Sequence, residues 1–191
     1  MNVLGGLLCV VLFAVTSCSQ APQSPSAAQR FDQLRLPFRS VTRQSELVAA
    51  DVGHLHRFMQ RGDVVGARRA AVRLKRDGRA LAQHAGLIGN RVRMLTSLEG
   101  EQRLREYFRL TGQTLTWQWY EGTALTKLAD VVWADPLVTT VGAEHELRTT
   151  SGKARWYAYR ASVDASQASR WLRRFGHSFR YVIRSKAGSS K

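Results

Sequence analysis

The sequence predicts an all-α fold, an up-down-up-down four-helix bundle over residues 41–184, preceded by a leader and a flexible tether. Apolar side chains recur three and four residues apart through four long segments, which is the spacing of one face of an α-helix. Gly62 and the pair Asp135-Pro136 interrupt this spacing. Connections this short make consecutive helices antiparallel, as an up-down-up-down bundle requires.

The first helix is expected to begin after Pro37, because proline ends a helix that reaches it. Thr42 is a suitable N-cap residue for this helix. Gly62 is expected to end it, and Asp63 is placed to cap the next helix. The apolar face of the first helix is predicted to consist of Leu47, Val48, Val52, Leu55, Phe58 and Met59.

The second helix, from Val64, has the most regular pattern in the chain, because its apolar positions follow a heptad. Thr96 and Glu99 have the spacing of a capping box, and they predict the start of a third helix that ends at Asp135-Pro136. The predicted core positions of these two helices are Val64, Ala67, Ala71, Leu74, Gly78, Leu81, Ala85, Ile88, Val92, Leu95, Leu104, Phe108, Thr111, Leu115, Gln118, Gly122, Leu125, Ala129 and Val132.

The fourth helix is expected after a linker that contains Glu144-His145-Glu146. Its apolar face is weaker because alanine dominates it. The final residues, 185–191, contain two lysines among small residues and are predicted to form a basic disordered tail. The predicted core positions of the fourth helix are Ala154, Ala158, Ala161, Ala165, Ala168, Leu172, Phe175, Phe179 and Val182.

An α+β fold is the alternative for the C-terminal half, with a helical hairpin followed by a split βαβ sandwich. Residues 115–119 alternate apolar and polar side chains, and Ser151-Gly152 could form a hairpin turn. Trp117 and Trp119 distinguish the two folds, because they share one face of a strand but lie about 200° apart on a helix. The heptad continues through both tryptophans, which favours the bundle.

The N-terminus has the pattern of an export signal. Residues 3–15 are apolar and uncharged but shorter than the roughly 20 residues that cross a bilayer as a helix, so they are typical of a signal-peptide core. Residues 15–18, VTSC, follow directly and resemble the lipobox of bacterial lipoproteins. The resemblance implies that Cys18 becomes the first residue and carries a lipid. Cleavage by the ordinary signal peptidase after Ser19 or Ala21 is the alternative.

On this interpretation residues 1–17 are a lipoprotein signal peptide and residues 18–40 are a lipid-anchored flexible tether, rich in Pro, Ser and Gln near its start. Cys9 leaves with the leader, so Cys18 is the one cysteine of the mature chain and no internal disulfide can form. The protein is therefore expected to be exported. It would be anchored at the outer face of the cytoplasmic membrane or, in a two-membrane bacterium, at the outer membrane.

The basic charge is concentrated near the C-terminus. The chain has a formal net charge of +15, and residues 148–191 contain 11 basic side chains and one acidic side chain. The candidate residues for contact with an anionic surface are Arg170, Arg173, Arg174, Arg180 and Arg184. Anionic lipids, acidic wall polymers or an envelope protein are the expected partners, and nucleic acid is not expected for an exported chain. Solvated arginine faces without a partner are the alternative.

Catalytic and metal-binding patterns are weak. His54 and His56 are two residues apart, whereas a zinc-binding helix places its histidines at i and i+4. Asp51 and His54 have the i, i+3 spacing of a carboxylate-bundle metal site, but the chain contains no second such pair. Neither a nucleophile motif nor a glycine-rich phosphate loop is found. We therefore predict no catalytic, cofactor or metal residues.

These observations predict a non-enzymatic binding or scaffolding module of the cell envelope, with a basic surface toward anionic components. Two other functions stay open. A sensor domain could bind a small ligand in an aromatic pocket formed by Trp117, Trp119, Tyr120 or Trp133. An envelope enzyme or accessory subunit could have a site whose residues are far apart in the sequence. A buried pocket that contains His54 or Glu144 would favour this alternative.

Overall fold

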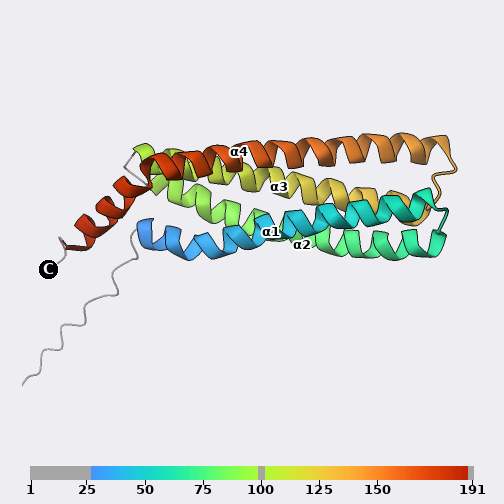
Figure 1. Cartoon of the computed structure of the whole chain (residues 1–191), viewed down its shortest axis with the longest axis horizontal. Coiled ribbons are helices and arrows are strands. Elements are labelled where there is room, and N and C mark those ends of the chain that lie inside the picture. The colour runs from blue at the N-terminus through green and yellow to red at the C-terminus, as the bar shows by residue number, and fades with distance from the viewer. Residues whose placement is uncertain (1–26, 99–101, 189–191) are drawn as a thin grey trace, which may run out of the picture.

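The computed structural model describes residues 27–98 and 102–188, together with most side chains of residues 37–96 and 105–174. These residues form four helices and no strand: α1 (Ala27–Gln60), α2 (Val64–Leu98), α3 (Gln102–Ala134) and α4 (Val141–Gly188). The helices run alternately up and down (Figure 1). The four-helix bundle is therefore confirmed, and the α+β alternative is wrong. The leader and Cys18 lie outside the described residues.

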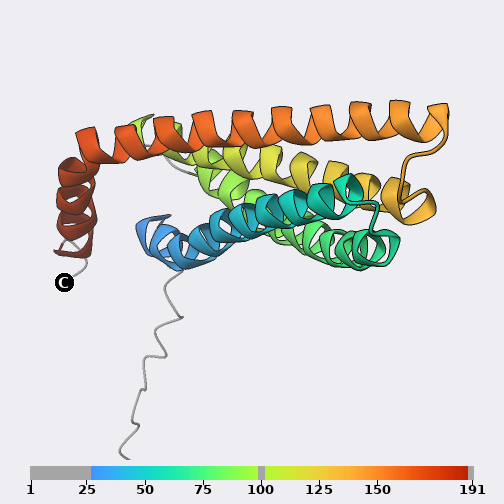
Figure 2. The ribbon, with the colours of Figure 1, turned by 45° about the vertical axis from the view of Figure 1, so that its right-hand side comes forward.

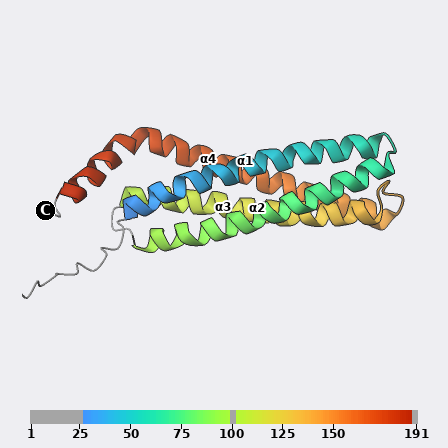
Figure 3. The ribbon, with the colours of Figure 1, turned by 90° about the horizontal axis from the view of Figure 1, so that it is seen from below.

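The four helices pack in chain order. α2 packs against α1 and α3, and α3 also packs against α4, so α2 and α3 each have two neighbours, whereas α1 and α4 each pack mainly against one. The start of α1 and the end of α4 lie at one end of the bundle, whereas the α1–α2 and α3–α4 connections lie at the other (Figures 1 and 3). The last part of α4 bends away from the axis of its longer first part (Figure 2).

The α1–α2 turn has the predicted end signals. Gly62 adopts a left-handed backbone conformation with φ of 68°, which glycine tolerates better than any other residue. The Asp63 N–H donates to the Phe58 carbonyl at 3.0 Å, so the last carbonyls of α1 are satisfied. The Asp63 side chain then accepts a hydrogen bond from the Gly66 N–H at 2.8 Å, which caps α2 as the sequence predicts.

The predicted start of the first helix is wrong. α1 begins at Ala27 and continues through Pro37, so residues 27–40 of the expected flexible tether are helical. Thr42 is not an N-cap, because its hydroxyl donates to the Phe38 carbonyl within the helix at 3.2 Å. Proline removes one backbone donor and strains the turn before it. The helix continues because Val41 and Val48 bury their side chains in the bundle on the following turns.

Two further boundaries differ from the prediction. α2 extends through Thr96, whose hydroxyl donates to the Val92 carbonyl at 3.0 Å, so Thr96 does not cap the next helix. α4 is helical through Gly188, beyond the predicted domain end at 184, so the first residues of the expected disordered tail are helical. In both cases the sequence contains no proline that would stop the helix earlier.

The linker expected before the fourth helix is shorter than predicted, and Glu144-His145-Glu146 lie in the first turns of α4. The connection is compact because the Asp135 carboxylate accepts hydrogen bonds from the Thr139 hydroxyl and from the Thr140 N–H, the latter at 3.1 Å. The Thr140 hydroxyl in turn accepts a hydrogen bond from the Ala143 N–H at 3.2 Å. Thr140 is therefore the N-cap of α4.

The heptad positions of α2 and α3 form the core as predicted. Leu74, Leu81, Phe108 and Leu115 are completely buried, and every other predicted core position of these two helices whose side chain is described is buried or partly buried. In α1 the prediction fails at Leu47, which is 61% exposed. Trp117 is partly buried and Trp119 is 41% exposed, as their different directions on a helix require.

Candidate functional site

A row of aromatic rings joins α3 to α4 near the middle of the bundle. The Tyr157 ring of α4 stacks on the Tyr120 ring of α3, with 5.3 Å between ring centroids, and on the Trp117 ring, with 6.1 Å. The Trp119 ring meets Tyr120 edge to face at 4.8 Å. Such pairs contribute about 0.5–1.5 kcal/mol each beyond their buried area. The row therefore links the two helices and is ordered by its own contacts.

A polar side chain and a cation hold the buried end of this row in place. The Trp117 Nε1–H donates to the Asp164 carboxylate at 2.8 Å, and Asp164 is only 5% exposed. The Arg160 guanidinium lies 5.4 Å from the Trp117 ring centroid and 5.7 Å from that of Trp156, within the range of a cation–π interaction. These contacts fix the orientation of Trp117 and, through stacking, that of Tyr157.

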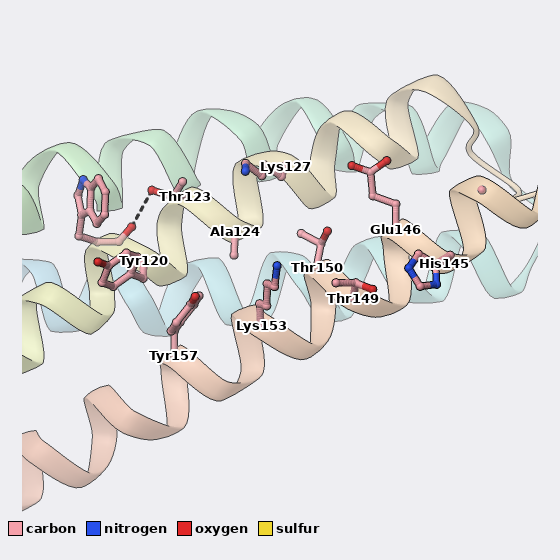
Figure 4. A pocket seen from close by; sticks show the side chains of 12 residues that line it. Tyr120, Thr123, Ala124, Lys127, His145, Glu146, Thr149, Thr150, Lys153 and Tyr157 are labelled. Atoms are coloured by element: carbon pink, nitrogen blue, oxygen red, sulfur yellow. Dashed lines mark hydrogen bonds between the residues drawn. The ribbon is translucent and has the colours of Figure 1, made fainter.

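A cleft of about 570 Å³ lies beside the aromatic row, between α3 and α4 (Figure 4). It exists because small residues occupy the facing positions: Ala124 lines one side, and a Cβ atom added at Gly142 would meet nothing within 4 Å. The lining combines aromatic rings, hydroxyl groups and charged side chains. It consists of Trp119, Tyr120, Thr123, Ala124, Lys127, Gly142, His145, Glu146, Thr149, Thr150, Lys153 and Tyr157.

The charged groups of the cleft come from both helices. Lys153 extends from α4 toward α3, between Thr150 and Tyr157 (Figure 4). Lys127 lines the cleft from α3, and neither lysine forms an ion pair within the described part of the chain. Glu146 is the single acidic side chain of the lining. The arrangement can therefore attract an anion, whose charge the lysines would balance.

The sequence predicted only part of this cleft. It named Trp119 and Tyr120 as candidates for an aromatic pocket, and both line the cleft. Trp117 lies behind it in the aromatic row, whereas Trp133 is exposed elsewhere on α3, with the Arg68 guanidinium 5.8 Å from its ring centroid. Tyr157 and both lysines were missed. A helical projection of residues 142–157 could have found Tyr157 and Lys153, but the N-terminal part of that segment was expected to be a linker.

The predicted basic residues lie at the other end of α4. Arg170 and Arg173 are exposed and border a shallow hollow of about 310 Å³ together with two serines. Arg174 is also exposed and takes part in an interaction with other residues of the chain. Arg180 and Arg184 lie in the last part of α4, and their side chains are outside the described residues. This is the end of the bundle where α1 begins (Figures 1 and 3).

The other candidates from the sequence do not join either region. The His54 imidazole lies 3.9 Å from the Asp51 carboxylate, on α1. Neither His54 nor Glu144 lines the α3–α4 cleft. Among the side chains that the structure describes, no three of His, Cys, Asp or Glu are grouped as metal ligands would be. Over residues 27–98 and 102–188, no helix combines the length and hydropathy that a bilayer span needs.

Besides Asp164, a second buried acidic residue was not predicted. Glu121 of α3 is 3% exposed, and its carboxylate accepts a hydrogen bond from the Ser45 hydroxyl of α1 at 2.9 Å. Burial raises the pKa of the Glu121 carboxyl to about 7, although the hydrogen bond from Ser45 acts in the opposite direction. On the same helix, Thr111 and Gln118 each have a buried side-chain oxygen without a hydrogen-bond partner among the described residues. The buried face of α3 therefore contains several polar side chains spaced along the helix.

Comparison with known proteins gives no match: no family model, no curated protein and no solved structure matches this chain. The described residues by themselves define the class of protein: a four-helix bundle with a basic α4 and an aromatic, lysine-containing cleft between α3 and α4.

Proposed function

We propose that the protein is a lipid-anchored, non-enzymatic binding module of the bacterial cell envelope. It is exported and held through Cys18 at the outer face of the cytoplasmic membrane or, in a two-membrane bacterium, at the outer membrane. The basic end of α4 contacts anionic lipid headgroups there. The observation that carries this proposal is that Arg170 and Arg173 are exposed in the C-terminal half of α4, the helix whose end lies at the same end of the bundle as the start of α1 (Figures 1 and 3).

Chain length supports this orientation. Nine residue steps separate Cys18 from Ala27, where α1 begins, and such a stretch spans at most about 30 Å. α3 contains 33 residues, which corresponds to about 50 Å of helix. A lipid on Cys18 would thus keep the start of α1 close to the bilayer. The end of α4 would share that position, because the two lie at the same end of the bundle (Figure 3).

Electrostatics supports the choice of an anionic surface. A basic residue near an anionic membrane contributes about 1 kcal/mol of attraction. Arg170 and Arg173 form no ion pair within the described residues, and the one acidic side chain of residues 148–191, Asp164, is buried against Trp117. The positive charge of this end is therefore directed to the solvent or to a partner.

The anchor is tested in cells that express the full chain. Cys18→Ser is expected to abolish incorporation of a palmitate analogue and to leave the precursor uncleaved or move the protein to the soluble fraction, because Cys18 is the one cysteine in the lipobox position. Cys9→Ser is the control and should be labelled and fractionated as the unchanged protein is. A Cys18→Ser protein that is still labelled would contradict the lipobox interpretation.

The basic end is tested with the chain from residue 19 onward and lipid vesicles. It is expected to co-sediment with vesicles that contain phosphatidylglycerol and to be released as salt is raised, because ions screen the attraction. The double change Arg170→Gln and Arg173→Gln should weaken binding at least tenfold, given about 1 kcal/mol per residue.

The control removes the same charge from the opposite end of the bundle. Arg57→Gln with Arg61→Gln changes two exposed arginines beside the α1–α2 turn and should alter vesicle binding less than threefold. Equal binding to neutral and anionic vesicles would overturn the role of charge. Equal weakening by the two double changes would overturn the role assigned to the end of α4.

A further inference from the structure

We propose that the cleft between α3 and α4 is a binding site for a small organic anion that contains a ring, such as an acidic sugar or an aromatic carboxylate. The ring would pack against the exposed surface of Tyr120 and Trp119, and the carboxylate would lie between Lys153 and Lys127. This inference does not depend on the lipid anchor or on membrane binding, because the cleft and the basic end of α4 use different residues.

The aromatic surface is ordered before a ligand arrives. Tyr120 is 40% exposed, and Trp119 is 41% exposed, so both rings keep surface for another ring. The rings of Tyr157, Tyr120 and Trp117 form a cluster in which the centroids lie 5.3 to 6.2 Å from one another, and Trp117 is held by Asp164. A ligand therefore does not have to order these side chains, and binding avoids that part of the entropy cost.

The cations distinguish an anion from a neutral ligand. Lys127 and Lys153 bring two positive charges to the cleft from opposite helices, against the single carboxylate of Glu146. Neither ammonium group forms an ion pair within the described residues. Hydrogen bonds between an ammonium group and a carboxylate are stronger than those between neutral partners. A carboxylate would thus gain more in this cleft than an alcohol of the same shape.

The volume of the cleft and the hydroxyl groups that line it suit a ligand of one or two rings. A volume of about 570 Å³ is within the range of about 300–1,000 Å³ that small-molecule sites occupy. Thr149 and Thr150 place hydroxyl groups beside Lys153 (Figure 4), whereas the Thr123 hydroxyl already donates to the Trp119 carbonyl at 2.9 Å. Apolar rings on one side and a few polar groups on the other are the usual composition of such sites.

The test is ligand-observed NMR on the chain from residue 19 onward, with two matched pairs of probes. Glucuronate is compared with glucose, and 2-naphthoate is compared with 2-naphthalenemethanol. We expect saturation transfer to at least one of the two carboxylates, and a Kd at least tenfold lower for that carboxylate than for its neutral counterpart. Binding of glucuronate would indicate an acidic sugar as the ligand, and binding of 2-naphthoate would indicate an aromatic acid.

Variants locate the binding. Lys153→Gln should raise the Kd of the bound carboxylate at least tenfold, and Lys153→Arg should restore most of the affinity because it keeps the charge. Tyr120→Leu should also raise the Kd, because it removes the ring and keeps an apolar side chain. Arg155→Gln is the matched control. It removes the same charge from an exposed position on α4, but Arg155 does not line the cleft.

Each outcome decides the proposal. Binding of neither carboxylate at millimolar concentration would overturn it, and so would equal affinity for the neutral and anionic probes. An effect of Arg155→Gln as large as that of Lys153→Gln would show attraction to the general positive charge and no site in the cleft. Circular dichroism of each variant confirms that the bundle is folded. None of these results depends on whether the chain binds vesicles.

Discussion

Gly122→Ala is expected to lower the free energy of unfolding by about 3 kcal/mol, near the upper end of the usual range for overpacking. The backbones of α2 and α3 meet at this point. A Cβ atom on Gly122 would lie 2.5 Å from the Gly78 carbonyl oxygen and 2.7 Å from the Ala82 nitrogen. These are backbone atoms that cannot rotate away, so the two central helices would have to separate. Urea denaturation followed by circular dichroism measures the change.

Gly152→Ala is the matched control for this prediction. Gly152 also lies inside a helix, but a Cβ atom there would meet nothing within 4 Å. Alanine is a better helix former than glycine by about 1 kcal/mol, so this variant should be slightly more stable than the unchanged protein. If Gly122→Ala lowers the free energy of unfolding and Gly152→Ala raises it, the close approach of α2 and α3 is the cause of the destabilisation. A destabilisation below about 0.5 kcal/mol for Gly122→Ala would contradict the helix contact described here.

The sequence was sufficient for the core face of the central pair of helices. In α2 and α3 the heptad positions carry small or apolar residues, with Gln118 as the exception, and positions such as Leu74 and Leu115 are completely buried. Even the glycines at positions 78 and 122 follow this pattern, because the heptad marks which face meets the neighbour. The pattern could not reveal that the helices approach closely there, which depends on the packing of two faces together.

The flanking helices were predicted less well, for reasons that are local. Pro37 is a strong stop signal in isolation, yet α1 continues through it because the following turns are held by burial of Val41 and Val48. The start of α4 depends on hydrogen bonds between Asp135 and Thr140, which spacing alone does not indicate. An apolar side chain such as Leu47 can also fit the helical period and still face away from the core.

The candidate site was visible in the sequence only through its aromatic residues. Trp119 and Tyr120 were recognised as possible pocket residues, whereas Lys153 and Tyr157 reach the same cleft from α4, more than 25 residues later in the chain. Their meeting depends on the register of α4 against α3, which the alanine-rich face of α4 specifies weakly. The distribution of charge in the sequence identified α4 as basic. It did not indicate which basic residues of α4 line the cleft, as Lys153 does, and which lie near the end of the helix.

The pH dependence of stability should reveal the buried carboxyl of Glu121, which lies beside a heptad position and was not expected in the core. Its pKa is about 7 in the folded chain, raised by burial from an ordinary value of 4.5. Between these two pH values the folded chain keeps a proton that the unfolded chain has released. Stability contributed by the protonated group is therefore complete below pH 4.5 and is lost as pH rises toward 7. The loss amounts to about 3 kcal/mol.

Glu121→Gln is expected to remove this dependence, because the amide stays neutral and its oxygen can still accept the hydrogen bond that Ser45 donates. The difference in free energy of unfolding between the variant and the unchanged protein should rise by about 1.4 kcal/mol per pH unit between pH 4.5 and pH 7 and stay level above that range. Urea denaturation at a series of pH values measures it. Glu46→Gln, an exposed change on α1, is the control and should give a difference that does not vary with pH. A flat difference for Glu121→Gln as well would mean that the Glu121 carboxyl keeps its ordinary pKa in the folded chain, and it would contradict the burial described here.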